Sequence, residues 1–283
     1  MSISTQQPIL PRPFLKWAGG KRQLLPELRQ RLPADWRERR YYEPFVGAGA
    51  LLFDLTPRRA VINDANGQLI LTYRALMEDC EGVIALLEEH RARHCKDYYY
   101  QVRALDREPG FYQRPDTERA ARLIYLNKTC YNGLHRVNSK GWFNVPYGRY
   151  VNPAICEPDA LRAVGAYLRQ NQVTLLCGDF AAAVQGARRD SFVYFDPPYH
   201  SPDKANFTSY HSNSFGEAEQ IRLRDTFAAL TRRGVPCLLS NSDTPFIRDL
   251  YRDYAIDTLQ ARRAINSNAA RRGAVSEVLI RNW

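Results

Sequence analysis

The sequence has no long apolar run and no leader-like beginning. No window of its 283 residues approaches the roughly 18 consecutive apolar residues that a membrane span requires. The first residues, MSISTQQPILPRP, lack the basic region followed by an apolar run that marks a secretory signal. We therefore expect a cytoplasmic protein that does not contact a membrane.

Metal-binding and disulfide motifs are missing as well. The six cysteines are scattered and form no C-x-x-C pair, so no zinc site or disulfide framework is indicated. His90 and His94 lie four residues apart, but Arg91 stands where the zinc-binding H-E-x-x-H pattern has glutamate. The sequence predicts reduced, mostly buried thiols, an exposed helix face that carries the two histidines, and no metal.

The composition excludes a disordered chain and points to a charged partner. Hydrophobic residues make up 45% and charged residues 25%, which is ordinary for a soluble globular protein. There are 40 Lys and Arg against 30 Asp and Glu, so the formal net charge is +10. This excess favours a polyanion such as nucleic acid, with solubility alone as an equal alternative.

Short apolar runs alternate with longer amphipathic stretches, which predicts an α/β fold with a mainly parallel sheet. The predicted strands are Tyr41–Glu43, Ala60–Asn63, Val173–Cys177, Phe192–Phe195, Pro236–Ser240 and Ser276–Ile280. An acid closes or follows five of these runs: Glu43, Asp64, Asp179, Asp196 and Asp243. Ligands bind beyond the carboxyl ends of such strands, so this repetition predicts a site there, although Asp also begins turns and caps helices.

The middle of the chain has a different pattern. Helical spacing is found at Leu69–Met77, Val83–Ala92 and Glu118–Asn127, and Ser139–Gly141 has the composition of a hairpin turn. Residues 127–156 include four basic residues, five interleaved aromatics among residues 131–150, and no acid. We interpret this stretch as part of an inserted helical and hairpin domain. A second basic stretch, Arg262–Gly273, predicts a loop that either meets phosphates or is simply solvated.

A glycine motif follows the first strand. In Glu43-Pro-Phe-Val-Gly-Ala-Gly49, two glycines allow a sharp turn that opens a helix at Ala50. Asp64 closes the next strand, where an acid can accept hydrogen bonds from ribose hydroxyls. Phe53 stands near the position of the third glycine of the dinucleotide fingerprint, which disfavours a nicotinamide or flavin cofactor and favours a nucleoside without phosphates.

The Asp196-Pro-Pro-Tyr199 tetrad is the most specific signal in the chain. The two prolines remove backbone donors and lock the loop after the apolar run Phe192–Phe195. The Asp196 carboxylate and the Pro197 carbonyl remain as rigid acceptors for an exocyclic amine, and they would stabilise positive charge that develops during methyl transfer. Tyr199 would stack on a base. The alternative is a structural Pro-Pro turn.

The third motif is Phe14-Leu-Lys-Trp-Ala-Gly-Gly-Lys21. Its glycines and Lys21 do not have the P-loop spacing. Trp17 and Lys21 lie four residues apart and could sit beside a cofactor at the start of a helix, or simply belong to the core.

Together these motifs resemble the Dam-type DNA adenine N6-methyltransferases along nearly the whole chain. Further matching segments, in chain order, are Asp64–Asn66, Tyr125–Asn127, Tyr131–Leu134 with Arg136, Phe143–Pro146, Gly148–Tyr150, Ala205–Thr208, Tyr210–His211 and Ser267–Asn268. The resemblance implies a Rossmann-like S-adenosylmethionine-dependent methyltransferase sheet with an inserted target recognition domain. The implied boundaries are 1–66 and 158–283 for the catalytic domain and 67–157 for the recognition domain.

The resemblance also implies S-adenosylmethionine as methyl donor, S-adenosylhomocysteine as product, and no metal. The implied cofactor contacts are Trp17, Lys21, Glu43, Phe45, Asp64, Asp179, Phe180 and Asp196. Asp196, Pro197, Pro198 and Tyr199 would carry direct transfer to adenine N6, with the adenine flipped out of the duplex.

The family reads GATC in double-stranded DNA. Arg136 matches its guanine-reading arginine, and Leu134 and Pro146 match contacts to a thymine methyl group. The remaining implied DNA-binding residues are Lys16, Tyr131, Asn132, Asn138, Asn144 and Tyr150, of which the two asparagines Asn138 and Asn144 would position the backbone.

Some residues depart from the family pattern, and these departures put the preference for flanking DNA sequence in question. They are His135, Val137, Tyr147 and the loop Ala269–Arg272, which is low in glycine.

The resemblance further suggests a monomer. The alternatives are a restriction-modification or RNA N-methyltransferase with another recognition sequence, a cytosine-N4 enzyme, and a DNA-binding regulator on an inactive methyltransferase fold.

Overall fold

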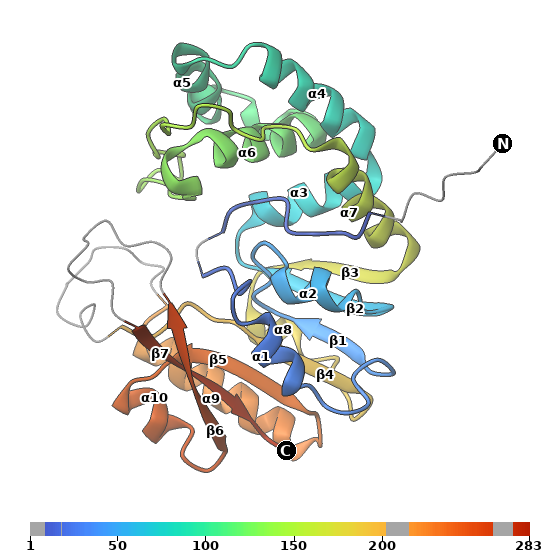
Figure 1. Ribbon diagram of the computed structural model, residues 1–283, viewed down its shortest axis with the longest axis vertical. Helices are drawn as coiled ribbons and strands as arrows, with labels where there is room; N and C mark the ends of the chain where they lie inside the picture. Colours follow the sequence, from blue (N-terminus) through green and yellow to red (C-terminus); the bar gives the residue numbers. More distant parts are fainter. Residues whose placement is uncertain (1–8, 18, 202–214, 263–273) are drawn as a thin grey trace. The chain divides into compact units, whose positions relative to one another are not determined.

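The computed structural model describes residues 9–17, 19–201, 215–262 and 274–283, and the chain forms two compact units (Figure 1). The first unit comprises Met1–Gly20, Gly47–Thr56 and Asn66–Cys177. The second comprises Lys21–Val46, Pro57–Ala65 and Gly178–Trp283. The matching segments at 205–208, 210–211 and 267–268, and Arg263, Arg271 and Arg272 of the basic stretch, lie outside the described residues.

A seven-stranded sheet has the strand order β3-β2-β1-β4-β5-β7-β6. Its strands are β1 (Arg40–Glu43), β2 (Arg59–Asp64), β3 (Gln172–Cys177), β4 (Ser191–Phe195), β5 (Cys237–Ser242), β6 (Ala255–Arg262) and β7 (Ala274–Arg281). β1 runs parallel to β2 and β4, and β4 runs parallel to β5, whereas β7 is antiparallel to β5 and β6. The predicted α/β fold class and all six predicted strands are confirmed.

The strand β6 was not predicted. Its residues, Ala255-Ile-Asp-Thr-Leu-Gln-Ala-Arg262, form no continuous apolar run. Among the described strands, β6 is the last in the sheet order and pairs with β7 alone. An edge strand needs few apolar side chains, so its composition does not mark it as a strand.

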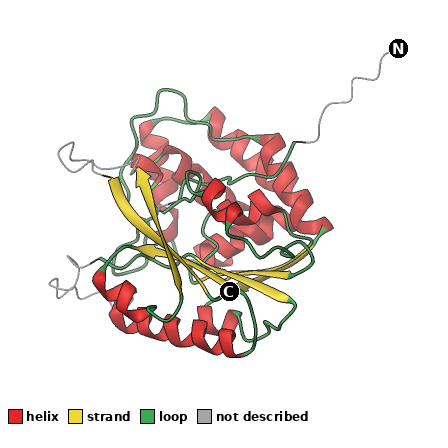
Figure 2. Cartoon of the chain, turned by 60° about the horizontal axis from the view of Figure 1, so that its bottom comes forward, coloured by secondary structure: helices red, strands yellow, loops and turns green. Residues whose placement is uncertain are grey.

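The second unit also contains four helices among its described residues. They are α1 (Leu25–Gln30), α8 (Phe180–Ala183), α9 (Glu217–Arg232) and α10 (Pro245–Leu250). Figure 2 shows helices against the sheet, and α8 and α9 contact β2 and β5. The side chains of β4 and β5 lie in the core, where Tyr194, Phe195 and Leu239 are at most 1% exposed.

The first unit is mainly helical. It contains α2 (Ala50–Leu55), α3 (Gly67–Glu78), α4 (Cys80–Ala92), α5 (Lys96–Ala104), α6 (Asp116–Thr129), α7 (Pro158–Gln170) and the short 3-10 helices η1 (Leu105–Arg107), η2 (Phe111–Gln113) and η3 (Tyr131–Gly133). Asn66 and Asp79 cap the N-termini of α3 and α4, accepting hydrogen bonds from backbone N–H groups of the first turn. The three predicted helices are confirmed.

The predicted turn at Ser139–Gly141 is also confirmed. Asn138 N donates to Trp142 O at 2.9 Å, Val137 and Phe143 form an antiparallel bridge, and Gly141 has φ +79°. The connection is therefore a tight turn closed by one bridge rather than a hairpin of two full strands.

The expectation of an exposed histidine face is wrong. His94 lies beyond the end of α4, and both histidines are half-buried. The His90 ring stacks on Tyr125 at 4.8 Å, and His94 Nδ1 lies 3.0 Å from Tyr125 Oη. Aromatic side chains from α5 and α6 cover the histidines, and the periodicity of α4 alone carries no information about that cover.

The prediction that most of the thiols are buried is confirmed. Four of the six free cysteines are buried, and Cys95 and Cys177 are exposed.

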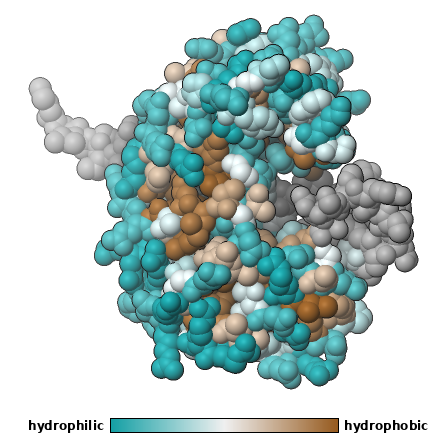
Figure 3. Space-filling model, turned by 180° about the vertical axis from the view of Figure 1, so that it is seen from behind, coloured by the Kyte–Doolittle hydropathy of each residue, from teal (hydrophilic) through white to brown (hydrophobic). Residues whose placement is uncertain are grey.

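Within the described ranges, no group of three or more potential ligand side chains could hold a metal ion. Among the described helices, none has the length and apolarity needed to cross a bilayer. On the face shown in Figure 3, hydrophilic side chains cover most of the described surface.

Candidate active site and recognition segment

The glycine motif forms the sharp turn that its sequence predicts. Gly47 and Gly49 have φ +50° and +70°, and α2 begins at Ala50. A Cβ on Gly47 would lie 2.8 Å from the Trp17 indole, and one on Gly49 would lie 2.8 Å from Tyr73 Oη. The glycines therefore admit neighbouring aromatic side chains of the first unit. Trp17 and Lys21 precede α1, which begins at Leu25, and Lys21 O accepts from Leu24 N at 2.8 Å in the turn that leads into the helix.

In the second unit, one buried amide joins three loops at the carboxyl ends of the strands. Asn63, at 2% exposure, donates to Pro44 O and to Gly178 O, each at 3.0 Å. Its own carbonyl accepts from Val46 N at 2.9 Å. The segments that carry Glu43, Phe45, Asp64, Asp179 and Phe180 are thereby brought together, as the strand-end acids predict. The sequence reasoning did not single out Asn63.

This region has the surfaces that an adenosine group requires. Phe45 stacks with Phe180 at 5.2 Å between ring centroids, and Phe215 packs edge-on against Phe45 at 5.6 Å. Glu43 is 3% exposed and accepts a hydrogen bond from Tyr41 Oη at 2.9 Å. An apolar aromatic wall beside strand-end carboxylates suits a purine and a ribose.

Two of the strand-end acids, Asp179 and Asp243, form ion pairs with arginine. Asp179 caps α8 through Ala181 N and Ala182 N and pairs with Arg222 at 2.6 Å; the hydrogen bond from Arg222 holds the pKa of Asp179 below its usual value. Asp243 pairs with Arg248 and is not brought to the cluster around Asn63. For Asp243, therefore, the strand-then-acid pattern marks an ion pair.

The tetrad begins directly after β4. Asp196 Oδ1 lies 2.8 Å from Lys21 Nζ and accepts from Ser240 Oγ at 2.9 Å. Lys21 is 5% exposed, so this ion pair is largely removed from water. Among the described residues, both polar contacts fall on Oδ1, which leaves Oδ2 and the Pro197 carbonyl as the acceptors that the sequence predicts.

The rest of the tetrad is also held by side chains. Tyr199 Oη donates to Glu277 Oε2 at 2.7 Å, and Lys21 Nζ lies 4.7 Å from the Tyr199 ring centroid. Burial raises the pKa of Tyr199 well above its usual value, and the neighbouring Asp196 carboxylate adds to the effect, so the hydroxyl stays protonated and donates.

Two buried side-chain amides, those of Gln220 and Asn241, support the backbone of the tetrad. Gln220 Nε2 donates to Pro198 O at 2.9 Å, and Asn241 Nδ2 donates to Gln220 Oε1 at 3.0 Å. Gln220 and Asn241 are fully buried. The supporting residues Ser240, Glu277, Gln220 and Asn241 were missed from the sequence. All four lie within strands or a helix rather than in the loops that follow them, and only the polar run Ser240–Asp243 at the end of β5 could have drawn attention.

In the first unit, residues 131–150, here called the recognition segment, present side chains to solvent. Tyr131 is 44% exposed and Leu134 36% exposed, and Asn132, Arg136 and Pro146 are exposed as well. Tyr131 N donates to Pro146 O at 2.9 Å, which closes the segment into a loop. Among the predicted DNA-binding residues, Asn138, Asn144 and Tyr150 are half-buried.

Asn144 holds Arg136, the residue that is predicted to read guanine. Arg136 Nε donates to Asn144 Oδ1 at 2.7 Å, and Asn144 N donates to Arg136 O at 3.0 Å. Asn138 Oδ1 accepts from Lys140 N and Trp142 N, each at 3.0 Å. Arg136 Nη2 also donates to Asn144 O at 3.5 Å, so Asn144 orients the guanidinium through two of its nitrogens. A bidentate contact to guanine would use the terminal nitrogens.

Buried side chains anchor the backbone of the recognition segment. Asp106 Oδ2 accepts from Phe143 N at 2.7 Å and pairs with Arg122 at 2.9 Å. Tyr99 Oη donates to Val145 O at 2.9 Å. Asp106 and Arg122 are each 6% exposed, so the anchor lies inside the helical unit.

Comparison with known proteins agrees with this arrangement. Residues 17–265 match the family described as D12 class N6 adenine-specific DNA methyltransferase. The Type II methyltransferase M1.LlaDCHI of Lactococcus lactis subsp. cremoris is 42% identical, over 100% of this chain and 99% of the relative. The Type II methyltransferase M.MjaIII of Methanocaldococcus jannaschii is 40% identical, over 96% and 99%. A DNA adenine methylase of Escherichia coli (strain K12) is 38% identical, over 95% and 94%.

These matches extend along almost the whole length of the chain and of its relatives. They coincide with a strand-end tetrad, an aromatic and acidic strand-end cluster, and an exposed basic segment within the described residues. The chain therefore belongs to the D12 class of N6 adenine-specific DNA methyltransferases.

Proposed function

We propose that this enzyme methylates adenine N6 in GATC sites of duplex DNA. Two observations carry the proposal: hydrogen bonds from neighbouring side chains hold the tetrad, and Asn144 orients Arg136. The chemistry belongs to the family, and the choice of GATC is supported by the resemblance of the recognition segment. Residues 67–157 are proposed as the target recognition domain, and the enzyme as a monomer.

S-adenosylmethionine supplies the methyl group. We propose that Phe45 and Phe180 form the wall for its adenine and that Asp64 accepts from its ribose hydroxyls, with further contacts from Trp17, Lys21, Glu43, Asp179 and Asp196. Because the carboxylate of Asp179 already has Arg222 and two N–H partners, we expect its contribution to come from its backbone.

The target amine would be held by the tetrad. Asp196 Oδ2 and Pro197 O accept its two hydrogens, so that the nitrogen lone pair becomes available and the developing positive charge is stabilised. Tyr199 stacks on the base, with its hydroxyl anchored by Glu277. A paired adenine has its amine engaged with thymine, so we propose that the base is flipped out before transfer.

The test is sequencing that detects 6-methyladenine on unmethylated plasmid after incubation with the protein and S-adenosylmethionine. Modification confined to GATC is the expected result. Modified adenines at another sequence would contradict the proposed specificity and keep the chemistry. That outcome would favour the second candidate, a modification enzyme with a different target; two relatives are named as type II methyltransferases.

A further inference from the structure

A buried asparagine connects the N-terminal segment to the recognition segment. Asn127, at the end of α6, is 1% exposed. Its Oδ1 accepts from Lys16 N at 2.8 Å, and its Nδ2 donates to Lys16 O at 2.7 Å and to Gly133 O at 2.9 Å. A side-chain amide has two donor hydrogens, and here both are used on carbonyls from segments far apart in sequence. The backbone of residue 16 is therefore tied to the beginning of the recognition segment.

The side chain of Lys16 lies across Gly133. A Cβ on Gly133 would come within 2.5 Å of Lys16 Cβ and 2.6 Å of Lys16 Cδ, and Gly133 has φ +62°. Only glycine satisfies both conditions. The Lys16 ammonium then lies 3.9 Å from the ring centroid of Tyr150, at the far end of the recognition segment.

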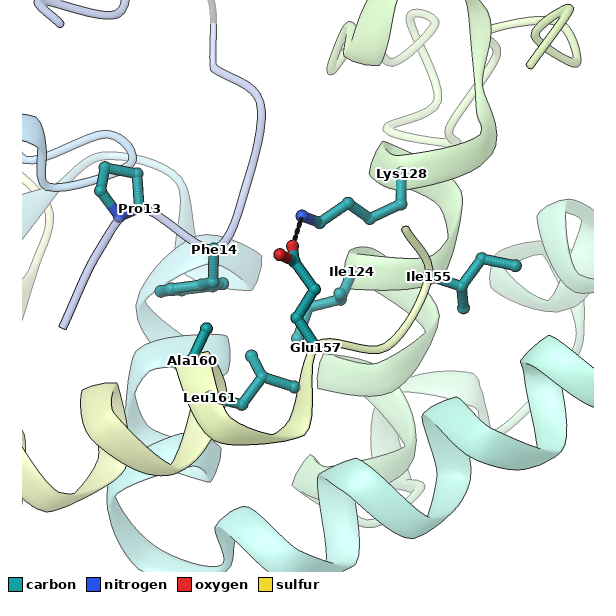
Figure 4. A pocket seen from close by; sticks show the side chains of 8 residues that line it. All are labelled: Pro13, Phe14, Ile124, Lys128, Ile155, Glu157, Ala160 and Leu161. Carbon is teal, nitrogen blue, oxygen red and sulfur yellow. Dashed lines mark hydrogen bonds and ion pairs between the residues drawn. The ribbon is translucent and has the colours of Figure 1, made fainter. Parts of the chain in front are cut away.

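Neighbouring contacts dock the same N-terminal segment. Trp17 stacks on His135 at 5.4 Å with an interplanar angle of 27°. Figure 4 shows Phe14 beside Ala160 and Leu161 of α7, near Lys128 of α6, whose Nζ pairs with Glu157 at 2.8 Å. Phe14 is 3% exposed. Residues 14–17 are thus a fixed part of the first unit, although about 110 residues of sequence separate them from the recognition segment.

We propose that Asn127 is a positioning residue for base discrimination, because it fixes the position of Lys16 relative to that of Arg136. This inference rests on the proposed function and on the family resemblance, which implies that Lys16 and Arg136 both contact the DNA. Base readout depends on hydrogen bonds whose geometry tolerates displacements of only a fraction of an ångström. Lys16 and Arg136 come from segments that are distant in sequence, so they can read one DNA site together only if their relative positions are fixed. The hydrogen bonds of the Asn127 amide fix them.

The residue type follows from the three contacts. Aspartate at this position would place carboxylate oxygens against two carbonyl oxygens. Leucine would leave the Lys16 N–H and two carbonyls buried without partners. Asparagine alone among residues of this size supplies one acceptor and two donors in one plane.

The experiment begins with the wild-type enzyme and the site that methylation mapping identifies, whether GATC or another. Methylation kcat/KM is then measured on the cognate duplex and on duplexes with one substituted base pair, for the wild type, Asn127→Ala, Lys16→Ala and the double variant. Asn171→Ala is the matched control, since Asn171 Nδ2 bonds only within the first unit, to Tyr167 O at 2.9 Å, away from the recognition segment.

We expect Lys16→Ala to relax discrimination at one base pair and Asn127→Ala to relax it at the same base pair, each at least fivefold. The double variant should discriminate no worse than Lys16→Ala, because Asn127 acts through Lys16. Asn171→Ala should discriminate as the wild type does. S-adenosylhomocysteine binding should be unchanged in Asn127→Ala, which shows that the folded site persists.

Several results would overturn the inference. One is an Asn127→Ala enzyme that melts at a lower temperature but discriminates normally. Another is an equal loss on every duplex, and a third is a further loss when Asn127→Ala is added to Lys16→Ala. If Asn127→Ala does not fold, Gly133→Ala makes the same test by displacing the Lys16 side chain. Modification at a site other than GATC would contradict the proposed function and leave this inference standing.

Discussion

The tetrad loop and the recognition segment are both loops, yet they are held in opposite ways. In the tetrad, the functional groups themselves have partners: Asp196 has Lys21 and Ser240, and Tyr199 has Glu277. In the recognition segment, buried residues hold the backbone instead. Asp106 binds Phe143 N, and the side chains at the tips remain in solvent.

The difference agrees with the roles that we propose for the two loops. Methyl transfer needs acceptors that are already oriented when charge develops, because reorientation during the reaction would cost activation free energy. Base readout needs donors that stay hydrated until they meet a base edge, so only the backbone is fixed. Arg136 is intermediate, since Asn144 orients its Nε and leaves its outer edge exposed.

The largest effect is expected at the tetrad. Asp196→Ala should lower the methylation rate by at least about 10³-fold, because it removes a preorganised acceptor of the developing charge. DNA binding, measured by fluorescence anisotropy, should persist. Asp190→Ala is the control, since it removes an exposed carboxylate just before the same strand. Retained turnover in Asp196→Ala would show that the acceptor lies elsewhere.

A specific loss is expected in the recognition segment. Arg136→Ala should cost about 1–3 kcal/mol of discrimination at one guanine, measured as the ratio of kcat/KM between cognate and substituted duplexes. Arg149→Ala, an exposed arginine of the same segment, should weaken all duplexes equally. Unchanged discrimination in Arg136→Ala would place guanine readout on another residue.

The first unit should also be acid-sensitive. Burial, aided by nearby Arg93, lowers the pKa of His90 from 6.5 to about 4. Between these values the unfolded chain binds more protons than the folded one, so stability is present above pH 6.5 and declines as the pH falls towards 4. Denaturant unfolding should lose about 2 kcal/mol between pH 7 and pH 5 from this residue.

His90→Phe tests the assignment. This variant should flatten the pH dependence without abolishing it, because burial also lowers the pKa of His94 and His135. An identical decline in the wild type and in His90→Phe would assign the acid sensitivity to other groups.

The smallest effect is expected at the hydrogen bond between Tyr199 and Glu277. Tyr199→Phe should slow single-turnover methylation about tenfold, the equivalent of one charge-assisted hydrogen bond. Glu277→Ala should have a similar effect, and the double variant should be no slower than either single variant. Additive losses would mean that Glu277 does not act through the Tyr199 hydroxyl.

Local chemistry made several parts of the molecule predictable. Sequence periodicity and turn residues predicted six of the strands, the three long helices and the turn at Ser139–Gly141. The strand-end acids predicted where Glu43, Asp64 and Asp196 gather, because the carboxyl ends of parallel strands meet at one edge. The edge strand β6 and the burial of His90 and His94 were missed, since both depend on neighbours distant in sequence.

The sequence by itself determined the α/β class, the family and the place of the Asp196–Tyr199 tetrad, because strand patterns and short motifs are local properties. Only the tertiary structure decided which side chains hold those motifs in place. Ser240, Gln220, Glu277 and Asn127 have ordinary local contexts, and each is distant in sequence from at least one group that it binds. A hydrogen bond between residues 111 positions apart depends on how the chain folds back on itself, and no local pattern encodes that return.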